Sequence, residues 1–295
     1  MTSRTDAPAR PRSTQRVRLP DGRTLGYADW GDPNGTPVIY FHGGLSARVD
    51  IAWAAPLCAE RGVRLIAPDR PGIGISQVQP GRTLLDWPRD VAALADALGI
   101  ERFAVLGWSL GAMYALACAY ILPERITRTA TVGGPAPLDT AAAGKQVGFI
   151  TDTILGALSN NAPPLAGALL MAMKLLPPAI VKWSQVQQSS APDRAVVSRL
   201  TPHQATAFFY EALRHGPAGE IQEYRIMYAP WGYQPEQIAG EVQLWHGAED
   251  ALCLPINAQQ LAARIPHATL TLVPNAGHYL LHTHVAEILD ALSAR

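Results

Sequence analysis

The sequence predicts an α/β fold: a mostly parallel sheet flanked by helices and interrupted by a helical cap. Three observations support this prediction. Short β-rich runs alternate with helical segments up to residue 139, the alternation stops, and it returns from residue 240 to the end. Strands that alternate with helices form right-handed crossovers, which give a parallel sheet covered on both faces. We therefore expect a core domain from residues 16–139 and 240–295, with residues 140–239 as the cap.

The first part of the core predicts a hairpin, then strands and helices in alternation. Two short alternating runs surround Asp21-Gly22, a dipeptide that favours a tight hairpin. The β-rich runs PVIYF and VRLIAP are separated by a helix-like stretch that ends at Gly62. A helical pattern that ends at Gly99 then precedes the strand RFAVLGWS, the apolar helix LGAMYALACAYILP and the strand RITRTATV. Residues 1–15 are polar and rich in Pro and Arg, so we expect a disordered tail there.

The second part of the chain contains the cap and the end of the core. Helix-like segments dominate from about residue 140, and the punctuating runs are NNAPP, LLPP and HGPAG. A connection this long inside a sheet domain is usually a functional lid or a small separate domain. The strand and helix pattern returns with EVQLWHG, a helix near residues 256–264, the run ATLTLVP and a final helix from about Leu280.

The overall composition excludes several classes of partner. Lys plus Arg and Asp plus Glu each number 24, so no net field attracts nucleic acid or an anionic membrane. The three cysteines, Cys58, Cys118 and Cys253, are scattered and odd in number, which argues against a disulfide framework and favours the cytoplasm. No residues at metal-ligand spacing predict a bound metal, and we expect no cofactor. A homo-oligomer is compatible with this composition.

The sequence contains no uninterrupted apolar stretch that is long enough to predict a membrane-spanning helix. The longest candidate, residues 162–181, is interrupted by Lys174 and by Pro177-Pro178. A membrane-spanning helix needs about 18 or more uninterrupted apolar residues, so we expect no stable membrane insertion. The N-terminal residues also lack the apolar segment of a secretory signal, which again favours the cytoplasm. The expected partner is therefore a small-molecule substrate.

A serine between two glycines is the candidate nucleophile. In the run GWSLG, Ser109 follows a predicted strand and precedes a predicted helix. This is the GxSxG pattern of a nucleophile elbow, in which the serine adopts a strained backbone conformation at a sharp turn. Gly107 and Gly111, two positions on either side, lack the bulky side chains that such a crowded turn excludes. A serine in an ordinary Gly-rich turn is the alternative, but the strand-to-helix context favours the nucleophile.

The base and its acidic partner are expected in the loops after the last two strands. A serine hydroxyl needs a base that a third group orients. His278 lies between the last predicted strand and the last helix, at the same edge of the sheet as Ser109. Asp250 follows the penultimate strand and is the expected acid, with Asp139 and Glu249 as alternatives. His282 and His284 fall on the following helix and are expected to be surface or packing residues, and His203, His215 and His267 have no comparable context.

By these motifs the chain resembles the α/β-hydrolase family of serine hydrolases. The resemblance covers about residues 16–139 and 240–295 and is carried by FHGG, DRPGIGIS, GWSLG, HGAED and NAGH in the family's order. It implies that the backbone N–H groups of Gly44 and Leu110 form an oxyanion hole, in which each donor is commonly worth about 2.7–4 kcal/mol. It also implies structural roles for His42 and Asp69. A serine in place of an aspartate nucleophile argues against an epoxide hydrolase or a dehalogenase.

The expected activity is hydrolysis of an ester or lactone of a small, largely apolar acyl group through an acyl-enzyme. The cap segments PPLAGALLMAMKLLPPAIVKW and TPHQATAFFYEALRHG supply Leu, Met and Phe and few charges, which predicts an apolar roof over the serine. Trp108 and Met113, next to the elbow, are candidates for lining the pocket. The alternatives are C–C bond hydrolysis, an aminopeptidase or cofactor-free haloperoxidase-like chemistry with the same triad, and a non-catalytic small-molecule-binding protein.

Overall fold

The computed structural model of the chain describes residues 12–137 and 150–294. In this part of the chain, eight strands form one sheet in the order β1-β2-β4-β3-β5-β6-β7-β8. β1 pairs antiparallel with β2 and β2 with β4, and all further neighbours pair parallel. The mostly parallel sheet is thereby confirmed. The strands are β1 (Arg12–Arg18), β2 (Thr24–Gly31), β3 (Thr36–Phe41), β4 (Val63–Pro68), β5 (Phe103–Trp108), β6 (Ile126–Val132), β7 (Val242–Gly247) and β8 (Ala268–Val273).

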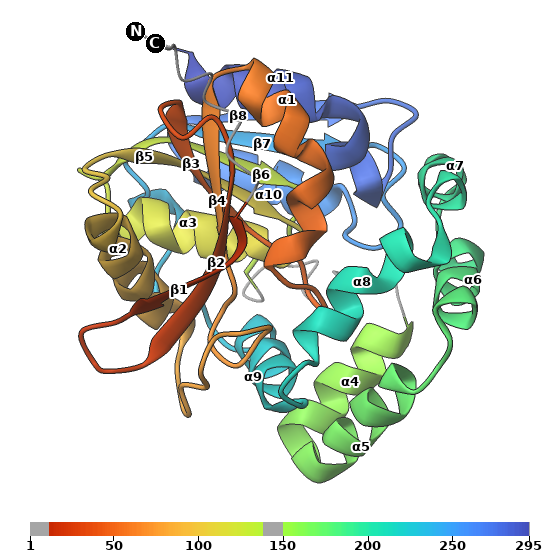
Figure 1. Cartoon of the computed structure of the whole chain (residues 1–295). Helices are drawn as coiled ribbons and strands as arrows, with labels where there is room; N and C mark the ends of the chain where they lie inside the picture. Colours follow the sequence, from red (N-terminus) through yellow and green to blue (C-terminus); the bar gives the residue numbers. More distant parts are fainter. Residues whose placement is uncertain (1–11, 138–149, 295) are drawn as a thin grey trace, which may run out of the picture.

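Helices cover both faces of the sheet (Figure 1). One core cluster joins the sheet to α2 (Trp87–Ala97), α3 (Gly111–Ile121) and α10 (Ile256–Arg264), and a second joins it to α1 (Ala55–Glu60) and α11 (Leu281–Ser293). Nine of the eleven residues of α3 are buried, as its apolar sequence predicts. The short 3₁₀ helices are η1 (Arg48–Ala54), η2 (Leu84–Asp86), η4 (Pro235–Gln237) and η5 (His278–Leu280).

The first strand begins earlier than the composition predicts. The composition predicts that residues 12–15 belong to the tail, whereas β1 begins at Arg12 and pairs with β2. The backbone of Ser13 also accepts a hydrogen bond from the Arg48 side chain at 2.9 Å. Pairing with the open edge of β2 therefore orders a segment whose polar composition alone favours disorder. Residues 1–11 lie outside the described part of the chain.

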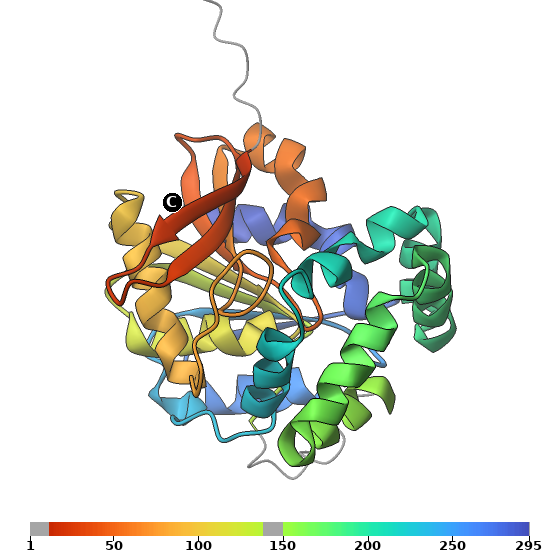
Figure 2. The ribbon, with the colours of Figure 1, turned by 60° about the horizontal axis from the view of Figure 1, so that its bottom comes forward.

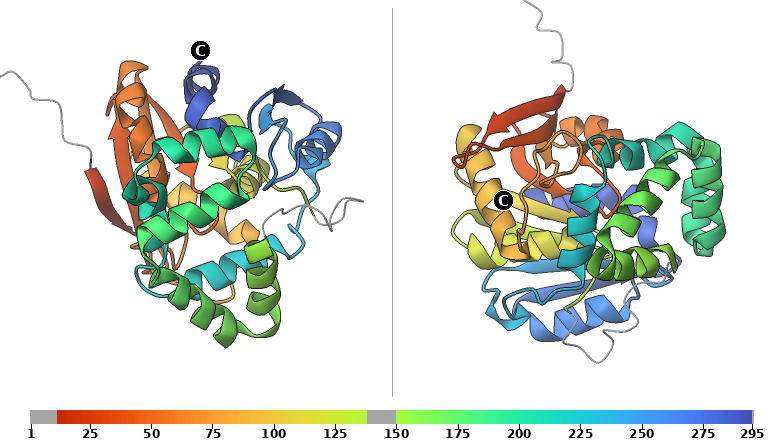
Figure 3. Two further views of the ribbon diagram at one scale, coloured as in Figure 1. Left: turned by 90° about the vertical axis from the view of Figure 1, so that its right-hand side faces the viewer. Right: turned by 90° about the horizontal axis from the view of Figure 1, so that it is seen from below.

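Six described helices between β6 and β7 form the cap, which stands beside the sheet (Figures 2 and 3). Pro lies in the first turn of α5, α6, α7 and α8, where its missing N–H leaves no intrahelical bond unmade. The predicted helical cap is thereby confirmed, although the boundaries at residues 140 and 239 stay predictions. The cap helices are α4 (Ile150–Asn161), α5 (Pro163–Lys174), α6 (Pro178–Gln188), α7 (Ala191–Arg199), α8 (Pro202–Ala212) and α9 (Ala218–Met227).

Within residues 12–137 and 150–294, no single helix combines the length and apolar character that a membrane span requires. The consecutive helices α5 and α6 have the required length and apolar character only when taken together, and a bend of 110° separates them.

The parallel strands bring four predicted site segments to one edge of the sheet. Parallel strands end on the same side, so the residues that follow them converge. Gly44 follows β3, Ser109 follows β5, Asp250 follows β7 and His278 follows β8. The fold therefore collects residues from across the whole chain at the carboxyl edge of the sheet, which the cap adjoins.

We expect Gly111→Ala to destabilise this arrangement of β3 and α3. A Cβ at Gly111 would lie 2.0 Å from the carbonyl oxygen of Phe41, so the helix and the strand must move apart. The free energy of unfolding, measured by urea denaturation, should fall by about 1–3 kcal/mol. Gly240→Ala is the control, because a Cβ there meets no atom within 4 Å. Equal losses in the two variants would contradict the close approach of β3 and α3.

Candidate active site

Ser109 occupies a strained turn between β5 and α3. Its φ is +53°, in the left-handed region that residues other than glycine rarely adopt. Its N–H donates to Val132 O at 2.8 Å, and its carbonyl accepts from Ala112 N at 2.9 Å. A Cβ at Gly107 would lie 2.4 Å from the carbonyl oxygen of Gly111, so the turn leaves no room for larger residues there. The local geometry is that of a nucleophile elbow.

The imidazole of His278 and the carboxylate of Asp250 form a buried hydrogen-bonded pair. His278 Nδ1 lies 2.8 Å from Asp250 Oδ2. The other oxygen of Asp250 accepts the backbone N–H groups of Leu252 and Cys253 at 2.8 and 2.9 Å. Both carboxylate oxygens therefore have partners, and Nδ1–H donation to Asp250 leaves Nε2 of His278 as the free acceptor of a proton.

Burial and charge act in opposite directions on this pair. Burial is the largest influence on the pKa of His278 and lowers it, but Asp250, with smaller contributions from Asp193 and Asp152, raises the net pKa above 6.5. Burial likewise raises the pKa of Asp250, but His278 and His246 hold it well below its usual range. His246, at the end of β7, places its Nε2 2.7 Å from Cys253 O and 3.4 Å from Asp250 Oδ2. Asp250 therefore stays ionised opposite the imidazole.

Glu249 and Asp139 are the alternatives to Asp250 as the partner of His278, and the structure describes only the first of them. Glu249 is exposed, and Asp250 beside it is turned inward and buried. The N–H of Asp250 bonds to Gly247 O, which closes the turn after β7 and directs the Asp250 side chain toward His278. Asp139 lies outside the described residues. Asp250 is the acid that is hydrogen-bonded to the imidazole of His278.

Ser109 and His278 line the same cavity, which has a volume of about 190 Å³. Both side chains are described, and no hydrogen bond joins them in this structure. Hydrogen bonds between catalytic groups are often long in an enzyme without substrate and tighten when substrate binds. Trp108 also lines this cavity, and its Nε1 donates to the carbonyl oxygen of His278 at 3.0 Å. Trp108, the residue before Ser109, therefore holds the backbone of His278.

The loop after β3 brings Gly43 and Gly44 next to the elbow. A Cβ at Gly43 would lie 3.4 Å from Ser109 Cβ, and one at Gly44 would lie 3.5 Å from Leu110 Cδ2. Gly44 and Leu110 both line a second, smaller cavity of about 80 Å³ at Ser109. The two residues of the predicted oxyanion hole therefore adjoin the nucleophile.

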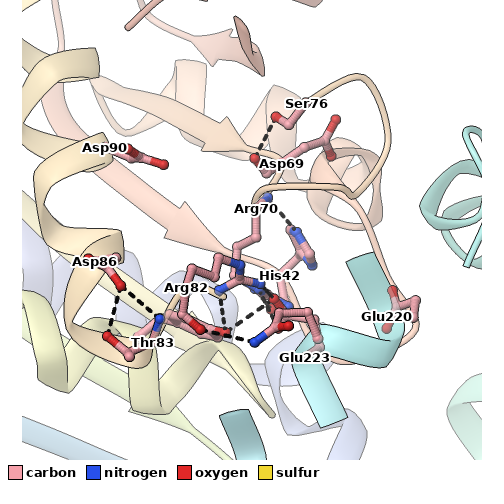
Figure 4. Close-up of polar contacts among 12 residues, drawn as sticks. His42, Asp69, Arg70, Ser76, Arg82, Thr83, Asp86, Asp90, Glu220 and Glu223 are labelled. Carbon is pink, nitrogen blue, oxygen red and sulfur yellow. Dashed lines mark hydrogen bonds and ion pairs between the residues drawn. The ribbon is translucent and has the colours of Figure 1, made fainter. Parts of the chain in front are cut away.

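The side chain of Arg70 is hydrogen-bonded to the backbone of this loop (Figure 4). Its guanidinium donates to His42 O at 2.6 Å, to Gly43 O at 2.8 Å and to Glu223 Oε2 on α9 at 2.8 Å. Glu223 also pairs with Arg82. The carbonyl groups of His42 and Gly43 are thus held by one buried guanidinium, which fixes the backbone of the loop beside Ser109.

His42 and Asp69 both lie away from the cavities at Ser109. Burial and the charge of Arg70 hold the pKa of His42 well below its ordinary value, so its ring is neutral. His42 Nδ1 lies 2.9 Å from Gly43 O. Asp69 is fully buried and accepts hydrogen bonds from the backbone and side chain of Arg48 and from Ile75 N. Both residues hold loops, in the way that the resemblance implies.

Met113 does not line the cavities at Ser109, so the prediction that it lines the pocket is wrong. It is fully buried in the cluster that joins α2 and α3 to the sheet, because it lies on the face of α3 turned toward this core. Trp108 does line the larger cavity. The apolar residues that share this cavity include Leu45, Met173, Leu176, Val181, Phe208 and Phe209.

Acidic side chains of the cap also lie beside the serine, although the cap sequence predicts few charges there. Asp152, Glu220 and Glu223 line the smaller cavity. Burial, followed by the charge of the neighbouring Glu223, raises the pKa of Glu220 to about 8. Tyr224 donates a hydrogen bond to Asp152 Oδ1 at 2.5 Å. The two guanidinium groups that pair with Glu223 compensate its charge. Within the described residues, no cluster of His, Cys, Asp or Glu could hold a metal ion.

Sequence reasoning missed several residues that support the site. Arg70 directly follows Asp69 in the run DRPG, and a charged residue so close to a buried strand was a usable signal. Glu223 had none, because its partners Arg70 and Arg82 lie far away in the sequence. His246 lies four residues before Asp250, and only the folded loop after β7 shows that the two side chains meet. The acidic residues of the cap are few in the sequence, and their convergence depends on how α4 and α9 pack.

The fold and the site together define a hydrolase of the α/β class. A model of the alpha/beta hydrolase fold family matches residues 36–285, so the chain belongs to this family. The chain is 29% identical over 268 residues to the pimeloyl-[acyl-carrier protein] methyl ester esterase of Aromatoleum aromaticum, which covers 87% of this chain and 97% of that protein.

Two further comparisons agree with this assignment. The bifunctional esterase/perhydrolase DCH of Acinetobacter calcoaceticus is 38% identical over 98 residues, 32% of this chain and 35% of that protein, so the match spans about a third of its length. A solved esterase from Exiguobacterium antarcticum has a TM-score of 0.72 at 18% identity and covers 95% of this chain and 99% of that one. At this identity the structural likeness shows the fold alone.

We expect Asp250→Asn to lower the pKa of His278. Asp250 is the group that raises the pKa of His278 most. Without its negative charge, the effect of burial dominates, so the pKa of His278 should fall below 6.5. The ring signals of His278, followed by NMR from pH 5 to 9, measure the change. Glu249→Gln is the matched control, because Glu249 is exposed and adjacent in sequence. An unchanged pKa in Asp250→Asn would contradict the electrostatic role of Asp250.

Proposed function

We propose that the chain is a serine hydrolase that cleaves an ester or lactone of a small, largely apolar acyl group through an acyl-enzyme. The observation that carries the proposal is the hydrogen bond between Asp250 and His278, whose side chain lines the same cavity as Ser109 at its strained turn. Buried pairs of this kind orient a base beside an activated serine. The esterase relatives of Aromatoleum aromaticum and Acinetobacter calcoaceticus support the same reaction class.

In this mechanism, Ser109 Oγ attacks the acyl carbon while His278 Nε2 takes its proton. Asp250 keeps the proton on Nδ1 and stabilises the imidazolium. The tetrahedral oxyanion accepts hydrogen bonds from the N–H groups of Gly44 and Leu110. His278 then protonates the leaving alcohol, and the acyl group stays on Ser109. A water molecule, deprotonated by His278, attacks the acyl-enzyme, and the acid leaves with Ser109 restored.

The apolar wall of the larger cavity supports an apolar acyl group as the preferred substrate part. Met173, Leu176 and Phe208 line it on the side of the cap. Burial of a methylene group is worth about 0.8 kcal/mol. An unpaired charge buried at the same place would cost several kcal/mol, so a charged acyl chain should be disfavoured there.

A substrate with an amino group is the second candidate. Asp152 and Glu220 of the cap line the smaller cavity beside the serine, where a carboxylate can accept hydrogen bonds from an ammonium group. Amino-acid p-nitroanilides, assayed beside acyl esters, distinguish the two candidates. Faster acylation by the anilides, reversed by Glu220→Gln, would favour the second.

We expect Ser109→Ala to remove nearly all turnover of p-nitrophenyl butyrate, because no other group replaces the nucleophile. Asp250→Asn should lower kcat by about 10⁴-fold, as the histidine then prefers the wrong tautomer. Circular dichroism should show that both variants fold. Glu249→Gln is the control and should keep wild-type kcat. Retention of turnover by Ser109→Ala, or a greater loss in Asp139→Asn than in Asp250→Asn, would contradict these assignments.

We expect kcat/KM for p-nitrophenyl esters to rise from acetate to about hexanoate. Each methylene that is fully buried should raise it about fourfold, which is 0.8 kcal/mol expressed as a rate ratio. Single-turnover acylation rates are the cleaner measurement, since cap motion can limit steady-state rates. The rise should stop when the cavity of about 190 Å³ is filled. A steady fall from acetate onward would contradict the apolar cavity as the acyl site.

A further inference from the structure

A carboxylate of the cap is bonded to the backbone of the histidine loop. Asp193, on α7, is buried, with 4% of its surface exposed. Its Oδ2 accepts the N–H of His278 at 2.9 Å, and its Oδ1 accepts the N–H of Tyr279 at 2.8 Å. Ser190 Oγ also donates to Asp193 Oδ2, at 2.9 Å. A residue 85 positions earlier in the chain therefore holds the residue that carries the imidazole.

The start of η5 has no side-chain partner of its own for these N–H groups. His278 and Tyr279 are the first two residues of η5, and the first N–H groups of a helix have no acceptor inside it. Gly277, which precedes them, has no side chain that could accept them. A Cβ at Gly277 would lie 2.3 Å from Asp193 Oδ2, so the glycine also provides the space for the carboxylate. Asp193 of the cap thus supplies the hydrogen-bond acceptors that the loop itself lacks.

We propose that Asp193 is a positioning residue that makes the orientation of His278 depend on the docking of α7. The proposal rests on the proposed function, in which His278 accepts the proton of Ser109. Asp250 orients the ring through Nδ1, while Trp108 bonds the carbonyl oxygen of His278. The backbone N–H is the remaining attachment point, and Asp193 holds it.

The negative charge of Asp193 gives this role a readout that a neutral packing contact lacks. Burial lowers the pKa of His278, Asp250 opposes burial most strongly, and Asp193 and Asp152 also raise this pKa. Loss of the Asp193 charge should therefore lower the pKa of His278. Because the neutral imidazole is the active form, activity should then persist to lower pH. Other ionisable groups near this site include His246 on β7, Tyr279 on η5, and His282 on α11, whose pKa burial lowers to about 4. Asp50 interacts with Tyr279, and Cys253 interacts with Asp250.

The test compares Asp193→Ala and Asp193→Asn in the full chain, with p-nitrophenyl butyrate as substrate. We expect kcat of Asp193→Ala to fall about 10- to 100-fold with KM changed less than about twofold, because a misplaced base slows chemistry more than binding. The acid limb of kcat/KM should move to lower pH in both variants. Asp193→Asn should lose less in kcat, since its amide oxygen still accepts one N–H. Arg199→Ala, on an exposed residue of α7, is the control and should match the wild type.

The outcomes separate this proposal from the proposed function. If Ser109→Ala keeps wild-type turnover, the proposed function fails whatever Asp193 does. If Ser109→Ala is inactive and a folded Asp193→Ala keeps both wild-type kcat and its acid limb, the positioning role of Asp193 is overturned. If Asp193→Ala does not fold, Asp193→Asn decides: an unchanged acid limb overturns the proposal, and a lowered one supports it.

Discussion

The left-handed backbone at Ser109 is the constraint on which the rest of the site depends. Such a conformation costs about 1–3 kcal/mol in a residue other than glycine, so it persists only where the surroundings impose it. Here β6 bonds the N–H of Ser109, while Gly107 and Gly111 let β5, α3 and β3 approach closely. The side chain is thereby held at the carboxyl edge of the sheet, at the start of α3, where the loop after β3 and the loop that carries His278 also lie.

Two carboxylates of the cap help to hold these two loops. Glu223 on α9 pairs with Arg70, whose guanidinium bonds the carbonyls of the loop after β3. Asp193 on α7 bonds the N–H groups at the start of η5. The cap therefore does more than supply apolar residues to the cavity, because its carboxylates also hold the core loops around Ser109 in place. A change in how the cap packs on the core should alter the positions of both loops, because each contact is buried and charge-assisted.

The sequence predicts the sheet, the order of the elements and the candidate Ser109, Asp250 and His278, because each depends on local periodicity or on a motif at a strand end. It misplaces Met113, since α3 is apolar on nearly all sides and its pattern does not distinguish the core from the pocket. It gives no sign of Arg70 meeting Glu223, 153 residues away, because such contacts arise from the packing of the cap on the core. It likewise undercounts the acidic groups beside the serine, which converge only in the folded chain.

The most direct test of the central claim, that Ser109 is acylated at the strained elbow, is mass spectrometry of the chain quenched in acid during turnover of p-nitrophenyl butyrate. The account predicts one butyryl group per chain, located by fragmentation on Ser109, and its absence in Ser109→Ala. Asp250→Asn should form the same adduct more slowly, because the base is less well oriented. A butyryl group on another residue, or rapid turnover without any adduct under conditions where deacylation is slowed, would contradict the account.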